Sequence, residues 1–151
     1  MKDDLDRIMH VMDAAFDPAW GEAWNRRQVE GSLVLPTTFY RLLNSEGNEA
    51  LPGEKPAAFA MVRAAPGEEE LLLIAVHPTS RRRGLGGLLV ELLATDAKAR
   101  GSERLFLEMR ENNTARTLYE SHGFIPIGRR KDYYKAADGT RLDAITYART
   151  L

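Results

Sequence analysis

The chain has 151 residues, enough for one domain with a substantial hydrophobic core and too few for two such domains. Hydrophobic residues make up 44% and charged residues 28%, as in ordinary globular proteins, and a net charge of −1 argues against nucleic-acid binding as the main role. The absence of cysteine excludes disulfides and a cysteine nucleophile, and His10, His77 and His122 lack the spacing of metal ligands, so we expect no metal.

The N-terminal region is predicted to form two helices. Apolar residues recur at helical spacing over residues 4–16, and Pro18 ends this first helix. A second helix is expected over residues 22–30. We expect Trp20 and Trp24 to serve the core; in the alternative interpretation they wall a substrate pocket. No apolar run in the chain approaches ~20 residues and the N-terminus lacks a signal-peptide core, so a cytoplasmic protein without membrane contact is expected.

Three strands are expected next, over residues 38–44, 57–64 and 71–76. Residues 45–56 are polar and contain glycines and prolines, which predicts an exposed hairpin loop. The third strand is an unbroken apolar run, which is typical of a strand buried on both faces.

The second half of the chain alternates helices and strands. The spacing predicts a helix over residues 85–100 stopped by Gly101 and a strand over 105–109. A further helix is expected with Asn112 or Asn113 as its N-cap, running to about Ser121. Two further strands fit residues 127–134 and 144–149. The order predicts one α/β domain, a mixed sheet of about six to seven strands flanked by helices, with a βαβα unit at its centre.

The run Arg81-Arg82-Arg83-Gly84-Leu85-Gly86 lies between an apolar strand and a helix start. The first N–H groups of a helix have no backbone partner and the helix dipole is positive there, so this turn suits a phosphate. Alternatively, the glycines serve only the turn and the arginines are solvated. A Walker A loop is excluded because no Gly-Lys-Ser/Thr occurs, and the dinucleotide fingerprint is excluded by Leu89.

Three polar residues follow that can carry chemistry. Glu108 interrupts an apolar strand, where burial tends to raise a carboxyl pKa and favours a general base; alternatively, it pairs with Arg110 or another cation. Asn113 can donate its amide to a ligand or simply cap a helix. Tyr119 can donate a proton to a leaving group or act as a packing residue.

Several motifs in this order resemble the GCN5-related N-acetyltransferase (GNAT) superfamily, and within it the bacterial ribosomal-protein-alanine N-acetyltransferases. They are Val76-His77-Pro78, Arg81-x-x-Gly84-x-Gly86, Leu107-Glu-Met-Arg-x-Asn-Asn113, Ala115-x-x-Leu-Tyr-Glu-x-x-Gly-Phe124 and Arg129-Arg-Lys-Asp-Tyr-Tyr134. The resemblance covers roughly residues 57–149. It implies a single N-acetyltransferase domain over residues 1–151, with acceptor-side elements in 1–56, an acetyl-CoA-binding core in 57–124 and C-terminal strands in 125–151.

The resemblance implies acetyl-CoA as cosubstrate and assigns roles to individual residues. Glu108 would be the general base and Tyr119 the general acid that protonates the CoA thiolate. The cofactor-binding residues would be Ile74, Ala75, Val76, Arg81, Arg82, Arg83, Gly84, Leu85, Gly86, Gly87, Asn113 and Tyr119. Trp20, Trp24, Tyr133 and Tyr134 are the expected substrate contacts, although a tyrosine pair on a strand can equally be cross-strand packing.

The acceptor is expected to be a primary amine, with a protein N-terminus favoured. The alternatives are a small amine such as a polyamine, amino acid or aminoglycoside, drawn by the acidic N-terminal region, or a non-catalytic acyl-CoA-binding regulator. Leu142 stands where the alanine acetyltransferases usually carry an acidic residue, and residues 1–55 match no family closely. We expect a monomer or homodimer.

Overall fold

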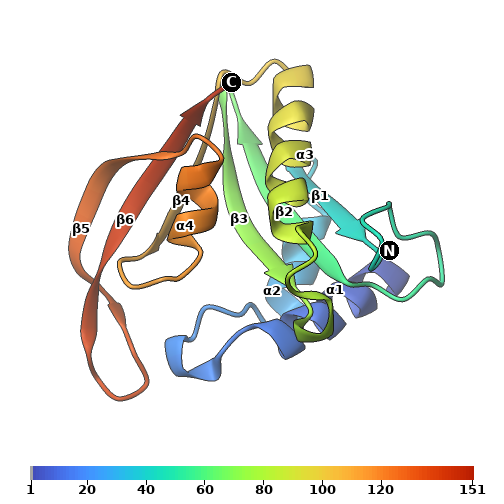
Figure 1. Cartoon of the computed structure of the whole chain (residues 1–151), viewed down its shortest axis with the longest axis horizontal. Helices are drawn as coiled ribbons and strands as arrows, with labels where there is room; N and C mark the ends of the chain where they lie inside the picture. The colour runs from blue at the N-terminus through green and yellow to red at the C-terminus, as the bar shows by residue number, and fades with distance from the viewer. Residues whose placement is uncertain (1) are drawn as a thin grey trace.

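Six strands in residues 2–151, the part of the chain that the computed structural model describes, form one sheet in the order β1-β2-β3-β4-β6-β5 (Figure 1). The strands are β1 (Thr38–Leu43), β2 (Ala58–Ala65), β3 (Glu68–Val76), β4 (Arg104–Arg110), β5 (Ile125–Lys135) and β6 (Arg141–Thr150). The helices are α1 (Lys2–Ala15), α2 (Arg26–Leu33), α3 (Leu85–Ala99) and α4 (Arg116–Ser121), with short 3-10 turns η1 (Pro18–Trp20) and η2 (Pro78–Ser80). The predicted order of elements and the mixed α/β sheet are confirmed.

The helices cover the sheet from both sides. One core contains Leu89 and Leu93 of α3 packed against Leu105 of β4 and Phe124, and the other contains Met12 of α1. Figure 1 shows α3 and α4 in front of the sheet and α1 and α2 behind it. Burying an apolar face of each element in this way supplies most of the stability of such a domain. Among the described residues, no helix has the length and apolar character needed to cross a membrane.

The parallel strands β3 and β4 diverge, and this divergence positions the functional site. They pair only where residues 68–70 of β3 meet residues 104–106 of β4. A β-bulge shifts the register between β2 and β3, because Met61 faces Leu73 while Val62 faces Leu71 and leaves Leu72 without a partner. A bulge bends its strand and increases the local twist. In Figure 1 the two strands meet at one end and separate toward their C-terminal ends.

Two predicted helix starts are wrong, each because of a local hydrogen bond. The second helix begins at Arg26 and not at residue 22, because Asn25 and Gln28 form a reciprocal capping box. The chain before it forms η1 instead. Helix α4 begins at Arg116 and not directly after Asn112 or Asn113, because the Asn113 side chain accepts a hydrogen bond from the Ala115 N–H at 2.9 Å and closes a turn there.

The expectation that residues 71–76 are buried on both faces is also wrong. Strand β3 begins earlier, at Glu68, and its burial alternates along the strand. Leu72, Ile74 and Val76 are only half-buried, because they line the opening between β3 and β4. The apolar residues of β3 therefore line a cleft and also contribute to the core.

The loop over residues 45–56 is less exposed than predicted. Ala50 is buried, and the Arg7 guanidinium of α1 donates hydrogen bonds to the carbonyl oxygens of Leu51 at 2.7 Å and Glu54 at 3.0 Å. Two backbone carbonyls are thus paired by one buried arginine. The loop is held against the first helix.

Candidate functional site

The opening between β3 and β4 contains a cavity of about 280 Å³. Its lining includes Glu22, Glu108, Arg110, Asn113 and Tyr119, together with apolar residues of β3, β4 and the end of α1. A second cavity of about 430 Å³ shares part of this lining and reaches Arg81 and Gly86. The two form one cleft that runs from Glu108 to the start of α3.

One wall of the cleft is an open strand edge. Because the pairing of β3 with β4 ends at residue 70, backbone groups of residues 71–76 on this side have no partner strand. An unpaired strand edge can bind an extended amide-containing ligand as an added strand would. The predicted contact residues Ile74, Ala75 and Val76 all line the cleft, and Ala75 is also buried in the core that contains α1 residues.

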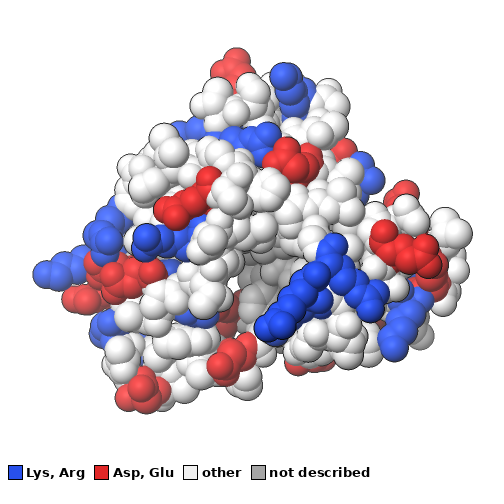
Figure 2. Space-filling model, viewed as in Figure 1, with Lys and Arg blue, Asp and Glu red and all other residues white. Residues whose placement is uncertain are grey.

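The loop before α3 presents backbone N–H groups at the other end of the cleft. Arg82 (φ 66°) and Gly84 (φ 75°) both adopt left-handed conformations, and no side chain of the described residues caps α3 at Gly84. Such a turn at a helix N-terminus forms a concave anion-binding surface. Arg81 donates a hydrogen bond to the Ala15 carbonyl at 3.0 Å, and the side chains of Arg82 and Arg83 are exposed. Figure 2 shows basic side chains over this loop, beside a hollow.

Gly86 and Gly87 have a packing role that the sequence did not indicate. A Cβ added at Gly87 would lie 2.8 Å from His122 Nε2, and one at Gly86 would lie 3.2 Å from Leu118 Cδ2. The two glycines therefore let α4 approach the first turn of α3. The His122 Nδ1 is fixed by Glu91 at 2.7 Å. Close packing of these helices places Tyr119 beside the cleft.

Glu108 faces the cavity from the middle of β4. Its neighbours Leu107 and Met109 are buried in the opposite face, so strand alternation directs Glu108 away from that core. Its Oε2 lies 3.1 Å from the Arg130 Nε, and the Arg130 side chain is 62% exposed. The alternative predicted from the sequence, that Glu108 pairs with Arg110 or another cation, is confirmed for another cation, Arg130 of β5.

Tyr119 and Asn113 approach the same cavity from α4 and the turn before it. Tyr119 is buried and packs edge-on against Phe124, with ring centroids 5.7 Å apart. Burial raises the pKa of the Tyr119 phenol, and the negative charge of Glu22 adds to the effect. The phenol therefore keeps its proton and can donate it. Asn113 uses its Oδ1 for the local turn, which leaves its amide nitrogen for a ligand.

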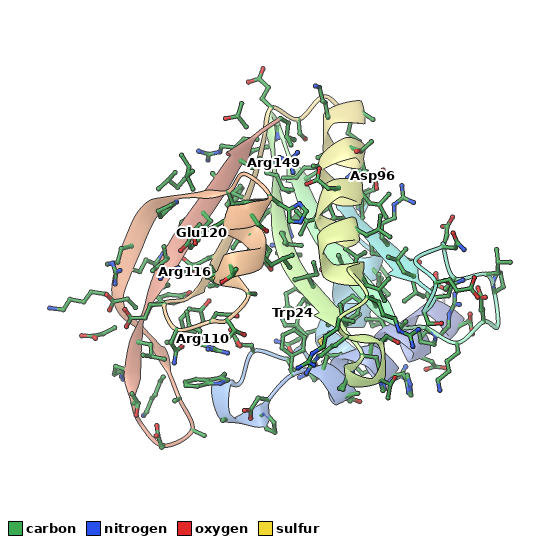
Figure 3. All side chains as sticks on the ribbon, viewed as in Figure 1. Trp24, Asp96, Arg110, Arg116, Glu120 and Arg149 are labelled. Carbon is green, nitrogen blue, oxygen red and sulfur yellow. The ribbon has the colours of Figure 1, made fainter. Side chains whose placement is uncertain are left out.

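The sequence did not indicate Glu22 and Arg110 as residues of the site. Glu22 lies in the segment between α1 and α2, and its Oε1 lies 3.2 Å from the Arg110 Nε at the end of β4. The Arg110 guanidinium also stacks 4.2 Å from the centroid of the Trp20 ring. Figure 3 shows Arg110 at the end of β4, near the segment that follows α1. These two residues are 88 positions apart, so no local pattern could have linked them.

The four aromatic residues predicted as substrate contacts are not among the lining residues of either cavity. Trp24 packs against the core beneath α1 and Trp20 lies against Arg110. Tyr133 and Tyr134 meet edge to face at 5.3 Å. Burial raises the pKa of Tyr134 to about 12, and the negative charges of Glu108 and Glu22 add to the effect. Their role in acceptor binding stays a prediction.

Comparison with known proteins identifies the family of this chain. The model of the family described as "Acetyltransferase (GNAT) family" matches residues 5–124. The chain belongs to the GNAT acetyltransferase family. The predicted family and enzyme class are confirmed: this acetyltransferase uses acetyl-CoA as its acyl donor.

Individual proteins show in more detail what the chain is similar to. The acetyltransferase is 35% identical over 120 residues, 76% of its own length and 82% of the relative's, to a "[Ribosomal protein bS18]-alanine N-acetyltransferase" of Haemophilus influenzae. Its structure is similar, with a TM-score of 0.80 and 32% identity over 97% of this chain and 87% of the other, to the ribosomal-protein-S18-alanine N-acetyltransferase from Escherichia coli. The NatC complex bound to Gag peptide and CoA shares the fold at a TM-score of 0.76 and 21% identity, covering 100% of this chain and 92% of the matched chain.

Proposed function

We propose that this acetyltransferase acetylates the α-amino group of a protein N-terminus, with an N-terminal alanine as the favoured acceptor. The observation that carries the proposal is the gathering of Glu108, Asn113 and Tyr119 around one cavity where β3 and β4 diverge. Similarity to enzymes named for alanine N-acetylation of a ribosomal protein supports the choice of acceptor.

The cleft fits acetyl-CoA, which when bound supplies an acetyl group as a thioester. The backbone amides from Arg82 to Gly87 would hold the pyrophosphate, where Gly84 leaves open space around its missing Cβ. The open edge of β3 at Ile74 and Val76 would bind the pantetheine amides. Asn113 would contact the same arm through its free side-chain nitrogen.

The proposed reaction is direct attack of the acceptor amine on the thioester carbonyl. A C–N bond forms and the C–S bond breaks; Glu108 takes the proton lost by nitrogen, and Tyr119 gives its proton to the sulfur. A β3 amide near Val76 would polarise the carbonyl oxygen. No covalent enzyme intermediate is needed, in line with a chain that has no cysteine.

The domain organisation is part of the proposal. Residues 1–56 would form the acceptor side, residues 57–124 the acetyl-CoA core and residues 125–151 the C-terminal strands. The contact of Glu22 with Arg110 supports this division, because it brings the N-terminal part to the rim of the cavity.

The acidic N-terminal region is a weaker argument for a polyamine acceptor than the sequence indicated. Asp3 and Asp4 pair with Arg7, and Asp6 pairs with Arg26. The Asp17 carboxylate accepts a hydrogen bond from the Ala19 N–H at 2.9 Å. Since these carboxylates have partners within the chain, their net attraction for a cationic acceptor is reduced.

A panel of acceptors tests the proposal. Thiol release from acetyl-CoA would be followed with a hexapeptide bearing N-terminal alanine, the same peptide already N-acetylated, and spermidine. We expect turnover of the free-amine peptide alone. Rapid acetylation of spermidine with an inert peptide would contradict the protein acceptor and leave the small-amine alternative.

A further inference from the structure

Glu22 is a second carboxylate in the wall of the cavity. It lies between η1 and α2, so its position depends on the segment that joins the first two helices. Its side chain is 18% exposed. A carboxylate this far from bulk solvent is costly unless it has a partner.

Arg110 is that partner, and two neighbouring side chains hold its guanidinium in place. The Arg110 side chain is 12% exposed, stacks on Trp20, and donates from Nη1 to the Asn112 Oδ1 at 2.8 Å. Among the described residues, Arg110 donates a hydrogen bond to one oxygen of Glu22, Oε1. The second oxygen is therefore left for a ligand in the cavity.

The surroundings of Glu22 differ from those of Glu108. Glu108 is paired with the exposed Arg130 of β5, whereas Glu22 is fixed by a half-buried, stacked guanidinium. Glu22 and Tyr119 line the same cavity, and the negative charge of Glu22 contributes to the raised pKa of both Tyr119 and Tyr134. A carboxylate whose orientation is fixed in this way suits binding better than proton transfer, because Arg110 holds one oxygen and the other can accept a hydrogen bond from a ligand.

We propose that Glu22 is a specificity-determining residue that binds the ammonium form of the acceptor amine. Glu108 takes the first proton and frees the nitrogen lone pair for attack. The proton left on nitrogen after attack returns to Tyr119, which has given its own proton to the sulfur. The proposal rests on the proposed function for its acceptor, an N-terminal α-amine. Most such amines carry a proton at pH 7, since their ordinary pKa is about 8. Glu22 therefore selects a charged amine and places it beside the base.

The variant Glu22→Gln tests this charge directly. Glutamine keeps an oxygen for Arg110 and removes only the negative charge. We expect the KM for the N-terminal alanine hexapeptide to rise about tenfold or more, because charge-assisted hydrogen bonds are the stronger ones. The KM for acetyl-CoA should not change. Glu46→Gln, an exposed change in the loop after β1, is the matched control.

A neutral ligand separates charge recognition from structural damage. Binding of the N-acetylated hexapeptide, measured by calorimetry in the presence of CoA, should be the same in wild type and Glu22→Gln. Equal weakening of both peptides would overturn the proposal, since a distorted cavity would explain it. The Glu22→Asp variant keeps the charge and should retain a peptide KM within a few-fold of wild type.

Wild-type enzyme gives a measurement that does not depend on how a variant folds. Affinity for the free-amine peptide in the presence of CoA should fall as the pH rises above about 8, where the amine loses its charge. Constant affinity across that range would overturn the proposal. If wild type acetylates the peptide and Glu22→Gln has an unchanged KM, the Glu22 proposal fails and the proposed function stands. If wild type acetylates only spermidine, the proposed function fails, and the spermidine KM of Glu22→Gln then decides the role of Glu22.

Discussion

Two carboxylates of the cavity are paired with arginines of very different exposure. The Arg130 partner of Glu108 is 62% exposed, and such exposed ion pairs contribute little to stability. Arg130 can therefore leave Glu108 at small cost when an acceptor enters. The Arg110 partner of Glu22 is 12% exposed and stacked on Trp20, so it stays in place. The proposed base, Glu108, and the proposed binding group, Glu22, are both carboxylates. They differ in how exposed their arginine partners are.

Replacing Glu108 by glutamine should lower kcat about tenfold or more at pH 7, because a general base contributes at least that factor. Acetyl-CoA affinity should change little, since the proposed acetyl-CoA contacts lie on β3, Asn113 and the loop before α3. Steady-state kinetics and calorimetry measure the two quantities. Arg130→Gln, which removes only the cation, is the matched control and should retain most of the turnover. Wild-type turnover in Glu108→Gln would remove Glu108 as the base.

At the scale of elements, α3 is joined to the sheet near its C-terminal end and to α4 at its first turn. Its last turn is fixed by Arg100, which pairs with the fully buried Glu69 of β3 at 2.7 Å. Nearer its middle, Asp96 accepts two hydrogen bonds from Arg41 of β1, each at 2.7 Å. Its first turn packs on α4 through Gly87. These contacts fix the helix whose N-terminus forms one end of the cleft.

The Arg41–Asp96 pair should make part of the stability depend on pH. The hydrogen bonds from Arg41 lower the pKa of Asp96 below its ordinary 3.8, although burial opposes the shift. A carboxylate with a lowered pKa in the folded state stabilises the fold above its ordinary pKa, and this contribution is lost as pH falls through the lowered value. Asp96→Asn should therefore be less stable than wild type by about 1 kcal/mol at pH 7.

Urea unfolding at pH 7 and pH 3 measures this effect. The difference in unfolding free energy between wild type and Asp96→Asn should shrink at the lower pH. Asp13→Asn, at an exposed position of α1, serves as the control and should show no such change. An equal difference at both pH values would show that the charge of Asp96 is not what stabilises the contact.

At the scale of the whole molecule, the sheet consists of two parts joined at one short parallel pairing. Strands β1 to β3 form one part and β4 to β6 the other, and only residues 68–70 and 104–106 pair across the junction. A ligand bound in the cleft would contact β3, the loop before α3, and residues after β4. It would bridge the two parts and stabilise the folded state by mass action.

Acetyl-CoA at one hundred times its Kd should stabilise wild type by about 2.7 kcal/mol, a rise in Tm of roughly 5–10 °C. Gly84→Glu should abolish the rise, because it places a side chain and a negative charge where the pyrophosphate would bind. Gly67→Glu is the matched control: it has the same left-handed backbone (φ 81°) and open surroundings, in a hairpin far from the loop. A full shift in Gly84→Glu would contradict the placement of the pyrophosphate.

The sequence by itself determined the order of elements, the loop before α3, and the choice of Glu108, Asn113 and Tyr119 as chemical groups. Helical and strand periodicity, glycine and proline positions and short motifs are local properties, so they can be read from neighbouring residues. The family followed from the same motifs and was confirmed by the match over residues 5–124.

The tertiary structure alone decided what surrounds these groups. The bulge at Leu72, the early end of the β3–β4 pairing, the Glu108–Arg130 pair and the Glu22–Arg110 contact all join distant parts of the chain. Such contacts depend on strand order and register, which periodicity does not specify. The sequence indicated the candidate reacting groups because their signals are local. The fold decided which charges face them, because those charges come from elements far apart in the chain.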